Sequence, residues 1–322
     1  GGVTMMVGRV LGESWRIYRQ RFGIVLFFSF IFFGSGYTLY YTGVLSAMQT
    51  VGGVSMDYIG MAVRWAQGTP FEALFYPDPA FMSPGGMDLG AMPIAMVLMM
   101  GAAVFLLAYG ILAVPMGMGG LTVLSTGEGS ALGWRSVYRG LKQRYTKLLV
   151  TYLCYMVYFM AAGFAYMIVY LIVGVFAAIA IPLIIMGSGV GVAFGVVLIL
   201  VSVLVIMAAY MVMMTLSVFV MPAAVFDRQY NFKAVGISIR TAWKHFFPVL
   251  GVQLVTLLLV GLATLLLFGV FFAIAWAAPD VPVYTPLWYG SLLTLTWPFS
   301  VIVNGVLYRH IQERDEANVQ AA

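Results

Sequence analysis

The stretch ESWRIYRQRFGIVLFFSFIFF, Glu13 to Phe33, decides the fold class, because a basic, aromatic segment runs without a break into an apolar run. The whole chain of 322 residues has the same character, with 63% apolar and 8% charged residues. A soluble domain carries about 25% charged residues, so this chain could not cover a water-facing surface. We therefore expect a single all-α integral membrane domain over residues 1–322, with lipid as its main solvent.

Six apolar runs are long enough to cross a bilayer, for which about 20 residues suffice. They lie at Gly23–Met48, Ala91–Leu124, Leu148–Met186, Val190–Phe226, Pro248–Ala278 and Leu287–Tyr308. The third and fourth runs hold no charged residue and offer room for two long spans or four short ones. Their strongest turn signal is Gly187-Ser188-Gly189, and no turn chemistry lies near Gly163 or Met207. We predict two spans there, and six transmembrane helices in total.

The charges give an orientation. Segments 1–22, 125–147, 226–247 and 309–322 hold 15 of the 16 lysines and arginines. The loops on the other side hold only Arg64, together with five acidic residues. Because cytoplasmic loops are enriched in Lys and Arg, this pattern predicts a cytoplasmic N-terminus and C-terminus. The setting it indicates is a bacterial-type cytoplasmic (inner) membrane.

The opening segment recurs along the chain. WRIYRQRF at 15–22 aligns with YRGLKQRY at 138–145 and, more weakly, with IRTAWKHF at 239–246. Each copy directly precedes a span, which predicts three degenerate units of one interfacial amphipathic helix plus a hairpin of two spans. The interfacial helices are expected at about 8–22, 130–147 and 228–247. The alternative is a set of basic flanks without any internal repeat.

The cations of these three segments are the predicted contacts to membrane phospholipid. Aromatic rings suit the headgroup layer, and arginine and lysine attract anionic lipid. The predicted anionic-lipid contacts are Arg16, Arg19, Arg21, Arg139, Lys142, Arg144, Arg240 and Lys244.

One sizeable loop, residues 51–90, is expected on the side opposite the basic segments. Residues 56–68 read as a short helix, and the part that follows holds four prolines and several aromatic residues. We expect a structural cap on the helix bundle. A lid or a docking surface for a partner is the alternative.

The apolar runs contain no Asp, Glu, Lys, Arg or His, which argues against an ion path or a proton relay. Cys154 is the only cysteine, so no intrachain disulfide is possible. His245 and His310 lie far apart in the sequence, and no metal site is expected. The glycine clusters do not fit a phosphate-binding loop, and the cations follow the membrane flanks rather than a nucleic-acid surface. We expect no enzyme activity, no cofactor and no nucleic-acid partner.

Polar side chains inside the spans form a second candidate site. Tyr155, Tyr166 and Tyr170 fall within roughly a 60° arc of a helix with 100° per residue. Asn304 lies near Pro298, which frees a backbone carbonyl. Tyr155, Tyr166, Tyr170 and Asn304 are therefore predicted to line an intramembrane polar cavity for an amphiphile. The alternative is hydrogen bonding between helices, with no cavity.

The repeated unit, SWRIYRQRF with its relatives VYRGLKQRY and RTAWKHFF, resembles the bacterial glycerophosphoryl diester phosphodiesterase membrane-domain family and related uncharacterised six-span inner-membrane proteins. The resemblance covers nearly the whole chain through degenerate motifs. In that family the membrane domain is sometimes fused to a soluble phosphodiesterase that carries the chemistry, and we expect no such domain in this chain. The resemblance implies a membrane scaffold or a lipid-related accessory role, and it brings no catalytic residue.

Two functions follow as hypotheses. The first is a non-enzymatic membrane scaffold or accessory subunit that binds lipid or a partner membrane protein, including a second copy of itself. The alternative is a transporter or permease-like subunit for an apolar or amphiphilic solute.

Overall fold

The computed structural model describes residues 2–52, 58–70, 92–126, 133–185, 189–278 and 284–320. Within these ranges the chain is almost entirely helical and holds no strand. Six helical segments are long and apolar enough to cross a membrane. They are Phe22–Val44, Met92–Leu124, Tyr145–Ile185, Gly189–Val225, Phe246–Ala277 and Tyr284–Gln320. The prediction of an all-α, multi-span membrane protein is confirmed.

The chain packs as two compact units. The first unit comprises residues 1–7, 146–254 and 307–322, and the second comprises residues 8–145 and 255–306. Both units draw on distant parts of the chain.

The first span belongs to the second unit and follows the basic helix α1 (Gly2–Gln20). It consists of α2 (Phe22–Ser29), a π-helical turn η1 (Phe30–Gly34) and α3 (Ser35–Gly52). The π turn was not predicted from the sequence. Such turns alter the direction of side chains within a helix, and here Gly34 comes against Gly290 and Thr294 of α14.

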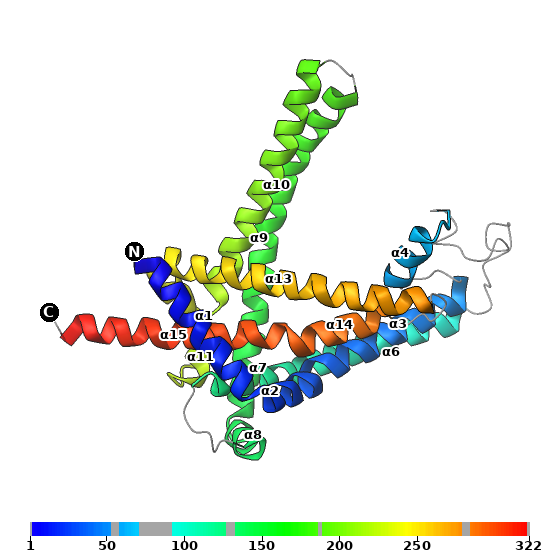
Figure 1. Cartoon of the computed structure of the whole chain (residues 1–322). Helices are drawn as coiled ribbons and strands as arrows, with labels where there is room; N and C mark the ends of the chain where they lie inside the picture. Colours follow the sequence, from blue (N-terminus) through cyan, green and yellow to red (C-terminus); the bar gives the residue numbers. More distant parts are fainter. Residues whose placement is uncertain are drawn as a thin grey trace. The chain divides into compact units, whose positions relative to one another are not determined.

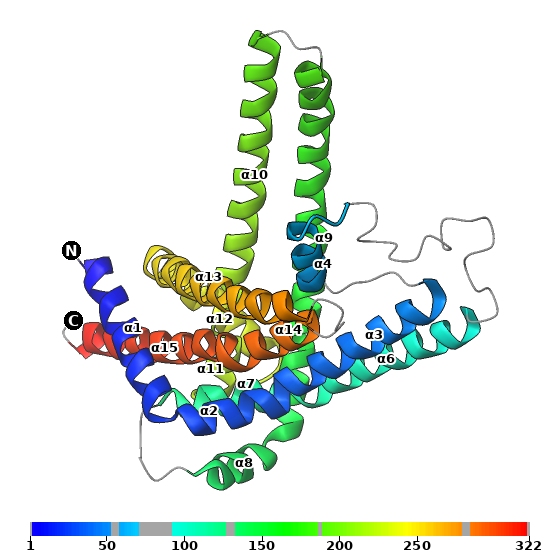
Figure 2. The same ribbon diagram turned by 45° about the vertical axis from the view of Figure 1, so that its right-hand side comes forward.

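The second span is built from α6 (Met92–Leu112) and α7 (Val114–Leu124). The helices α3 and α6 lie side by side along their length (Figures 1 and 2). The short helix α8 (Trp134–Lys142) comes next and packs against α7.

The third and fourth spans form a helical hairpin in the first unit. The helix α9 (Tyr145–Ile185) runs without interruption through Gly163, and α10 (Gly189–Ser217) runs through Met207, as predicted. The two lie side by side (Figure 2). At 1.5 Å per residue the 41 residues of α9 span about 61 Å, twice the hydrocarbon thickness of about 30 Å. Part of α9 must therefore tilt or lie outside the hydrocarbon layer.

The remaining helices complete the chain. They are α11 (Val220–Val225), α12 (Phe232–Lys244), α13 (Phe246–Ala277), α14 (Tyr284–Leu295) and α15 (Trp297–Gln320). The helices α14 and α15 together form the sixth span. In its most apolar stretch of 18 residues 50% are buried, whereas none are buried in the corresponding stretch of the fifth span, α13. The core therefore gathers on the last span of the chain.

The second span of each pair is broken near the end that precedes a basic segment. The breaks fall at Ala113, at residues 218–219 and at Thr296. Each is followed within three residues by a proline, namely Pro115, Pro222 and Pro298. Proline suits the first turn of a helix, because its missing N–H has no intrahelical acceptor there. The three breaks are thus equivalent features of three repeats: α1–α7, α8–α11 and α12–α15.

The three predicted interfacial segments are helical, although their bounds differ from those expected. Structure places them at Gly2–Gln20, Trp134–Lys142 and Phe232–Lys244. Each helix ends at a turn of one or two residues. These turns contain Arg21 after the first helix, Arg144 after the second and His245 after the third. These three residues occupy the same column of the sequence alignment. Arg21 and His245 also share their backbone conformation, with φ of −115° in both and ψ of 21° and 36°.

Four columns of the alignment are buried in all three repeats. On the basic helices they are Ser14, Val137 and Ser238, and then Tyr18, Leu141 and Ala242. At the start of the following span they are Val25, Leu148 and Val249, and then Phe28, Thr151 and Val252. The repeats therefore share a packed face as well as a sequence pattern.

The loop opposite the basic segments begins later than expected, because α3 continues to Gly52. Its predicted short helix is α4 (Tyr58–Ala66), which buries Ile59 and Val63 with Ala275 and Tyr284. The backbone N–H of Ile59 donates to the Thr285 hydroxyl at 3.2 Å. This helix packs on the end of α13 and the start of α14. The proline-rich part at 71–91 lies outside the described residues.

Candidate functional site

The basic helices α8 and α12 each pack on the broken second span of the repeat before them. In the second unit, α8 packs on α7, where a Cβ at Gly120 would lie 3.5 Å from Leu141. In the first unit, α12 packs on α10 and α11. The helix α1 has no preceding repeat, and it packs on the last one through Trp15 and Phe299, whose rings lie 6.2 Å apart. The order of packing is therefore cyclic. The basic helix of the third repeat packs on the second repeat, that of the second repeat packs on the first, and that of the first repeat packs on the third.

Tyrosine hydroxyls bind the backbone at two of the breaks. Tyr18 donates to the carbonyl of Leu295 at 2.6 Å, and Tyr145 donates to the carbonyl of Leu112 at 2.8 Å. Both acceptors lie three residues before the proline of their break. The Leu295 carbonyl is available because the N–H of Phe299, its partner in an unbroken helix, turns to Thr296 at 3.2 Å. The tyrosines thus satisfy carbonyls that the breaks release.

A serine performs this task at the third break. The Ser238 hydroxyl on α12 donates to the carbonyl of Leu216 at 2.8 Å and accepts from the N–H of Phe219 at 3.0 Å. It therefore satisfies both an acceptor and a donor of the interrupted helix. All three breaks are capped by a hydroxyl from the repeat that follows in the cyclic order.

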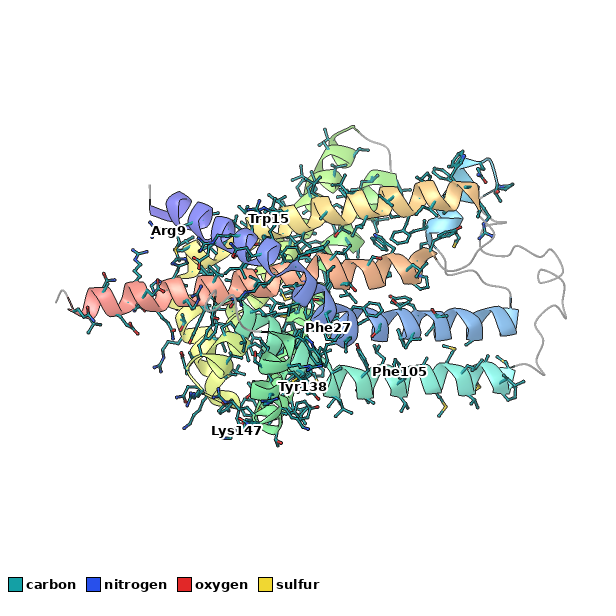
Figure 3. The ribbon with its side chains drawn as sticks, turned by 60° about the horizontal axis from the view of Figure 1, so that its bottom comes forward. Arg9, Trp15, Phe27, Phe105, Tyr138 and Lys147 are labelled. Carbon is teal, nitrogen blue, oxygen red and sulfur yellow. The ribbon has the colours of Figure 1, made fainter. Side chains whose placement is uncertain are left out.

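A pocket of about 640 Å³ lies in the second unit between α1, α13 and the α14–α15 break. Its lining is almost wholly apolar and includes Leu11, Gly12, Trp15, Leu259, Ala263 and Phe299. Figure 3 shows Trp15 on α1 where this helix adjoins α13. The volume falls in the range of about 300–1,000 Å³ that is usual for small-molecule sites.

An aromatic cluster forms one wall of the pocket. The rings of Trp15 and Tyr18 stack at 5.9 Å, and Phe299 meets Tyr18 edge to face at 5.9 Å. Burial raises the pKa of Tyr18 to about 12, so its hydroxyl stays protonated as the donor to Leu295. The side chain of Tyr18 therefore both caps the break and forms part of the pocket wall.

Six of the eight predicted lipid contacts are exposed cations for which no ion pair to a described carboxylate is found: Arg16, Arg19, Arg139, Lys142, Arg144 and Arg240. The other two have structural partners. Nη1 of Arg21 donates to the carbonyl of Leu124, the last residue of α7, at 3.1 Å. Nζ of Lys244 lies 2.7 Å from a carboxylate oxygen of Asp315.

The residues of the predicted polar cavity do not meet at the pocket. Tyr166 on α9 donates to the carbonyl of Ile206 on α10 at 3.0 Å, and its ring meets that of Tyr170 edge to face at 4.9 Å. Tyr155 lies on the same helix, and its ring packs on Phe159. Asn304 lies in the second unit on α15. Tyr166 therefore forms a hydrogen bond between two helices, which was the alternative to a polar cavity.

A hydrogen-bonded carboxylate in the first unit was not predicted from the sequence. Asp227, in the turn after α11, accepts from the Tyr308 hydroxyl at 2.5 Å and from Nε2 of Gln312 at 2.7 Å. Tyr308 is 1% exposed and packs on Phe219 with ring centroids 5.2 Å apart. The separation of 81 residues between Asp227 and Tyr308 explains why no local pattern predicted the contact.

A second carboxylate of the first unit is more exposed. Asp315 on α15 pairs with Lys244, and Nε2 of His245 lies 3.2 Å from it. The side chains of Asp315 and Lys244 are 32% and 61% exposed. Among the residues that the structure describes, no group of three or more His, Cys, Asp or Glu side chains is placed to hold a metal ion.

Comparison with known proteins gives no further guide. No family model matches the chain, and neither a curated protein nor a solved structure matches it. The resemblance to the glycerophosphoryl diester phosphodiesterase membrane-domain family therefore stays a prediction that rests on the three aromatic-basic segments.

Proposed function

We propose that this protein is a non-enzymatic scaffold or accessory subunit of a bacterial-type inner membrane, which gathers anionic phospholipid for a partner membrane protein or a second copy of itself. Its three basic helices are interfacial and amphipathic, and they lie on the cytoplasmic side together with both termini. The chemistry that recognises the lipid is the attraction between arginine or lysine and a phosphate headgroup.

One observation carries the proposal. Arg16, Arg139 and Arg240 occupy one column of the alignment, and all three are exposed on helices whose packed columns are also shared. A repeated packed face fixes the direction of the opposite face, so the same cation is presented three times. Each cation near an anionic membrane surface contributes about 1 kcal/mol.

The distribution of charge supports the same orientation. Fifteen of the 16 lysines and arginines lie on or beside the basic helices and the end of α15, and an even number of candidate spans separates any two of these segments. The positive-inside tendency places such a side in the cytoplasm.

Native mass spectrometry of the protein extracted in mild detergent, without delipidation, tests the proposal. We expect bound phosphatidylglycerol or another anionic phospholipid at constant stoichiometry, in preference to a zwitterionic lipid of equal abundance. A co-purified protein would identify the partner in the same spectrum. A bare monomer under conditions that preserve helicity would contradict the proposal.

The transporter alternative has one observation in its favour, namely the apolar pocket of about 640 Å³. A transported amphiphile would need access to this pocket from either side of the membrane. Uptake of a labelled amphiphile into vesicles that hold the purified protein separates the two functions, because a scaffold binds lipid without moving a solute.

A further inference from the structure

We propose that the pocket between α1, α13 and the α14–α15 break is a specific site for one anionic glycerophospholipid, with an acyl chain in the pocket and its phosphate at Arg16 and Arg19. This inference rests on the proposed lipid-binding function, which it deepens by naming one site and its ligand class. The other two repeats bind lipid only through exposed cations.

The space exists because small residues stand where larger ones would fill it. Gly12 on α1 and Ala263 on α13 both line the pocket, and a Cβ added at Gly12 would meet no atom within 4 Å. Apart from Thr296, the remaining lining is aliphatic or aromatic. Such a lining has too few polar groups to hold a charged or strongly hydrated solute, whereas a hydrocarbon chain needs none.

The polar atoms at the break do not compete for a ligand. The Tyr18 hydroxyl is committed to the carbonyl of Leu295 at 2.6 Å, and the Thr296 hydroxyl donates to the carbonyl of Leu292 at 2.8 Å. Neither hydroxyl therefore has a free O–H group to donate to a ligand. This arrangement favours an acyl chain over a hydrogen-bonding solute.

Charge at the rim selects the headgroup. The helix α1 carries Arg9, Arg16 and Arg19 against the single acid Glu13. Arg19 follows Trp15 by four residues, which places both on one face of the helix. Trp15 is 56% exposed while it lines the pocket, as suits a ring between hydrocarbon and headgroups. A phosphate placed at Arg16 and Arg19 leaves its acyl chain within reach of the pocket.

Each of the other basic helices lacks one of two features of α1, either the glycine at the position of Gly12 or the cation at the position of Arg19. The residue aligned with Gly12 is Arg135 on α8 and Gly236 on α12. The residue aligned with Arg19 is Lys142 on α8 but Trp243 on α12. Only α1 therefore combines a glycine at the position of Gly12 with a cation at the position of Arg19, one turn after the aromatic ring of Trp15.

Photolabelling of the full chain in vesicles tests this site. The probe is phosphatidylglycerol with a diazirine in one acyl chain, present as a tracer in phosphatidylcholine vesicles, and adducts are mapped by mass spectrometry of peptides. We expect adducts concentrated on residues 8–20 and 255–267. The same label on phosphatidylcholine should give at least threefold fewer adducts there.

A matched pair of variants decides the result. Gly12→Leu places a side chain in the pocket and should lower the pocket adducts at least fivefold. Gly8→Leu makes the same change one turn earlier on α1, also in open space and outside the lining, and should leave them unchanged. Ala263→Leu fills the pocket from the opposite wall and should repeat the effect of Gly12→Leu. Arg19→Gln should remove the preference for phosphatidylglycerol, and Arg19→Lys should retain it.

The outcomes separate this site from the wider proposal. If Gly12→Leu and Ala263→Leu leave the labelling unchanged, or if adducts spread evenly over α9 and α10, the pocket is not a specific site. Retention of anionic lipid in native mass spectra would then still support the scaffold. Loss of anionic lipid preference in the wild-type protein would overturn both.

Discussion

The Tyr18 hydroxyl donates a hydrogen bond of 2.6 Å to the carbonyl of Leu295, across 277 residues of sequence. This bond joins the first basic helix to the break in the last span. Tyr145 and Ser238 cap the other two breaks, so the bond belongs to a cyclic pattern rather than to an isolated contact.

Replacement of Tyr18 by Phe should lower the free energy of unfolding by about 1 kcal/mol, because the Leu295 carbonyl loses its donor while the ring is kept. The measurement is an unfolding curve in mixed detergent micelles, followed by circular dichroism. Tyr138→Phe on α8 serves as the control, since that side chain is exposed and should tolerate the change. Equal stability of both variants would show that the capping bond contributes nothing.

Gly34→Ala should destabilise the second unit by about 1–3 kcal/mol through overpacking. A Cβ at Gly34 would lie 2.9 Å from the backbone carbonyl of Gly290 and closer still to the Thr294 side chain. A side chain can turn away, but the backbone contact requires η1 and α14 to separate. Gly23→Ala, at a position with no atom within 4 Å of the added Cβ, is the matched control. The thermal midpoint in detergent should fall for the first variant alone.

The two carboxylates of the first unit should differ in their contribution to stability. Asp227→Ala leaves the buried Tyr308 hydroxyl without its acceptor and should cost about 1–3 kcal/mol. Asp315→Ala removes a half-exposed ion pair and should cost at most about 1 kcal/mol. A double-mutant cycle of Asp227→Ala with Tyr308→Phe measures the coupling directly. Additive effects in that cycle would contradict the assignment.

The shared arginine column should set the preference for anionic lipid. Each of Arg16→Gln, Arg139→Gln and Arg240→Gln removes about 1 kcal/mol of attraction, which corresponds to about a fivefold loss of selectivity at its own site. Native mass spectra with equal phosphatidylglycerol and phosphatidylcholine provide the measurement. Replacement of the same three residues by lysine keeps the charge and should keep the preference. A loss with lysine as well would point to the geometry of the guanidinium group instead.

The proposed orientation predicts which side of the membrane each loop faces. Ser136→Cys on the exposed face of α8 should react with an impermeant maleimide only in inverted vesicles, and Gln67→Cys after α4 only in intact cells. The wild-type chain is the blank, because its only cysteine, Cys154, is buried. The opposite labelling would reverse the assignment of the cytoplasmic side.

The sequence predicted the six spans and the helical nature of the basic segments, and these predictions depend on local properties. Hydropathy acts on each residue against the same lipid solvent, so a run such as Leu148–Met186 indicates a helix without reference to the rest of the chain. The π turn at Phe30–Gly34 was not predicted, because its apolar sequence does not differ from that of a regular helix; in the structure Gly34 lies against Gly290 and Thr294 of α14.

The candidate site was predicted less well. Six of the eight cations predicted to contact lipid are exposed in the structure, and their contact with lipid stays a prediction. The structural roles of Arg21 and Lys244 were missed, since their partners Leu124 and Asp315 lie 103 and 71 residues away. The apolar pocket was also missed, because its lining comes from three separate parts of the chain.

What the sequence by itself determined is therefore the set of helices, their apolar lengths and the side on which their charges gather. Only the tertiary structure decided that each basic helix packs on the broken span of another repeat, and that Gly12 and Ala263 leave a pocket between α1 and α13. The reason is physical: partition into lipid is a property of single segments, whereas packing and hydrogen bonds at a helix break depend on which distant side chains arrive there.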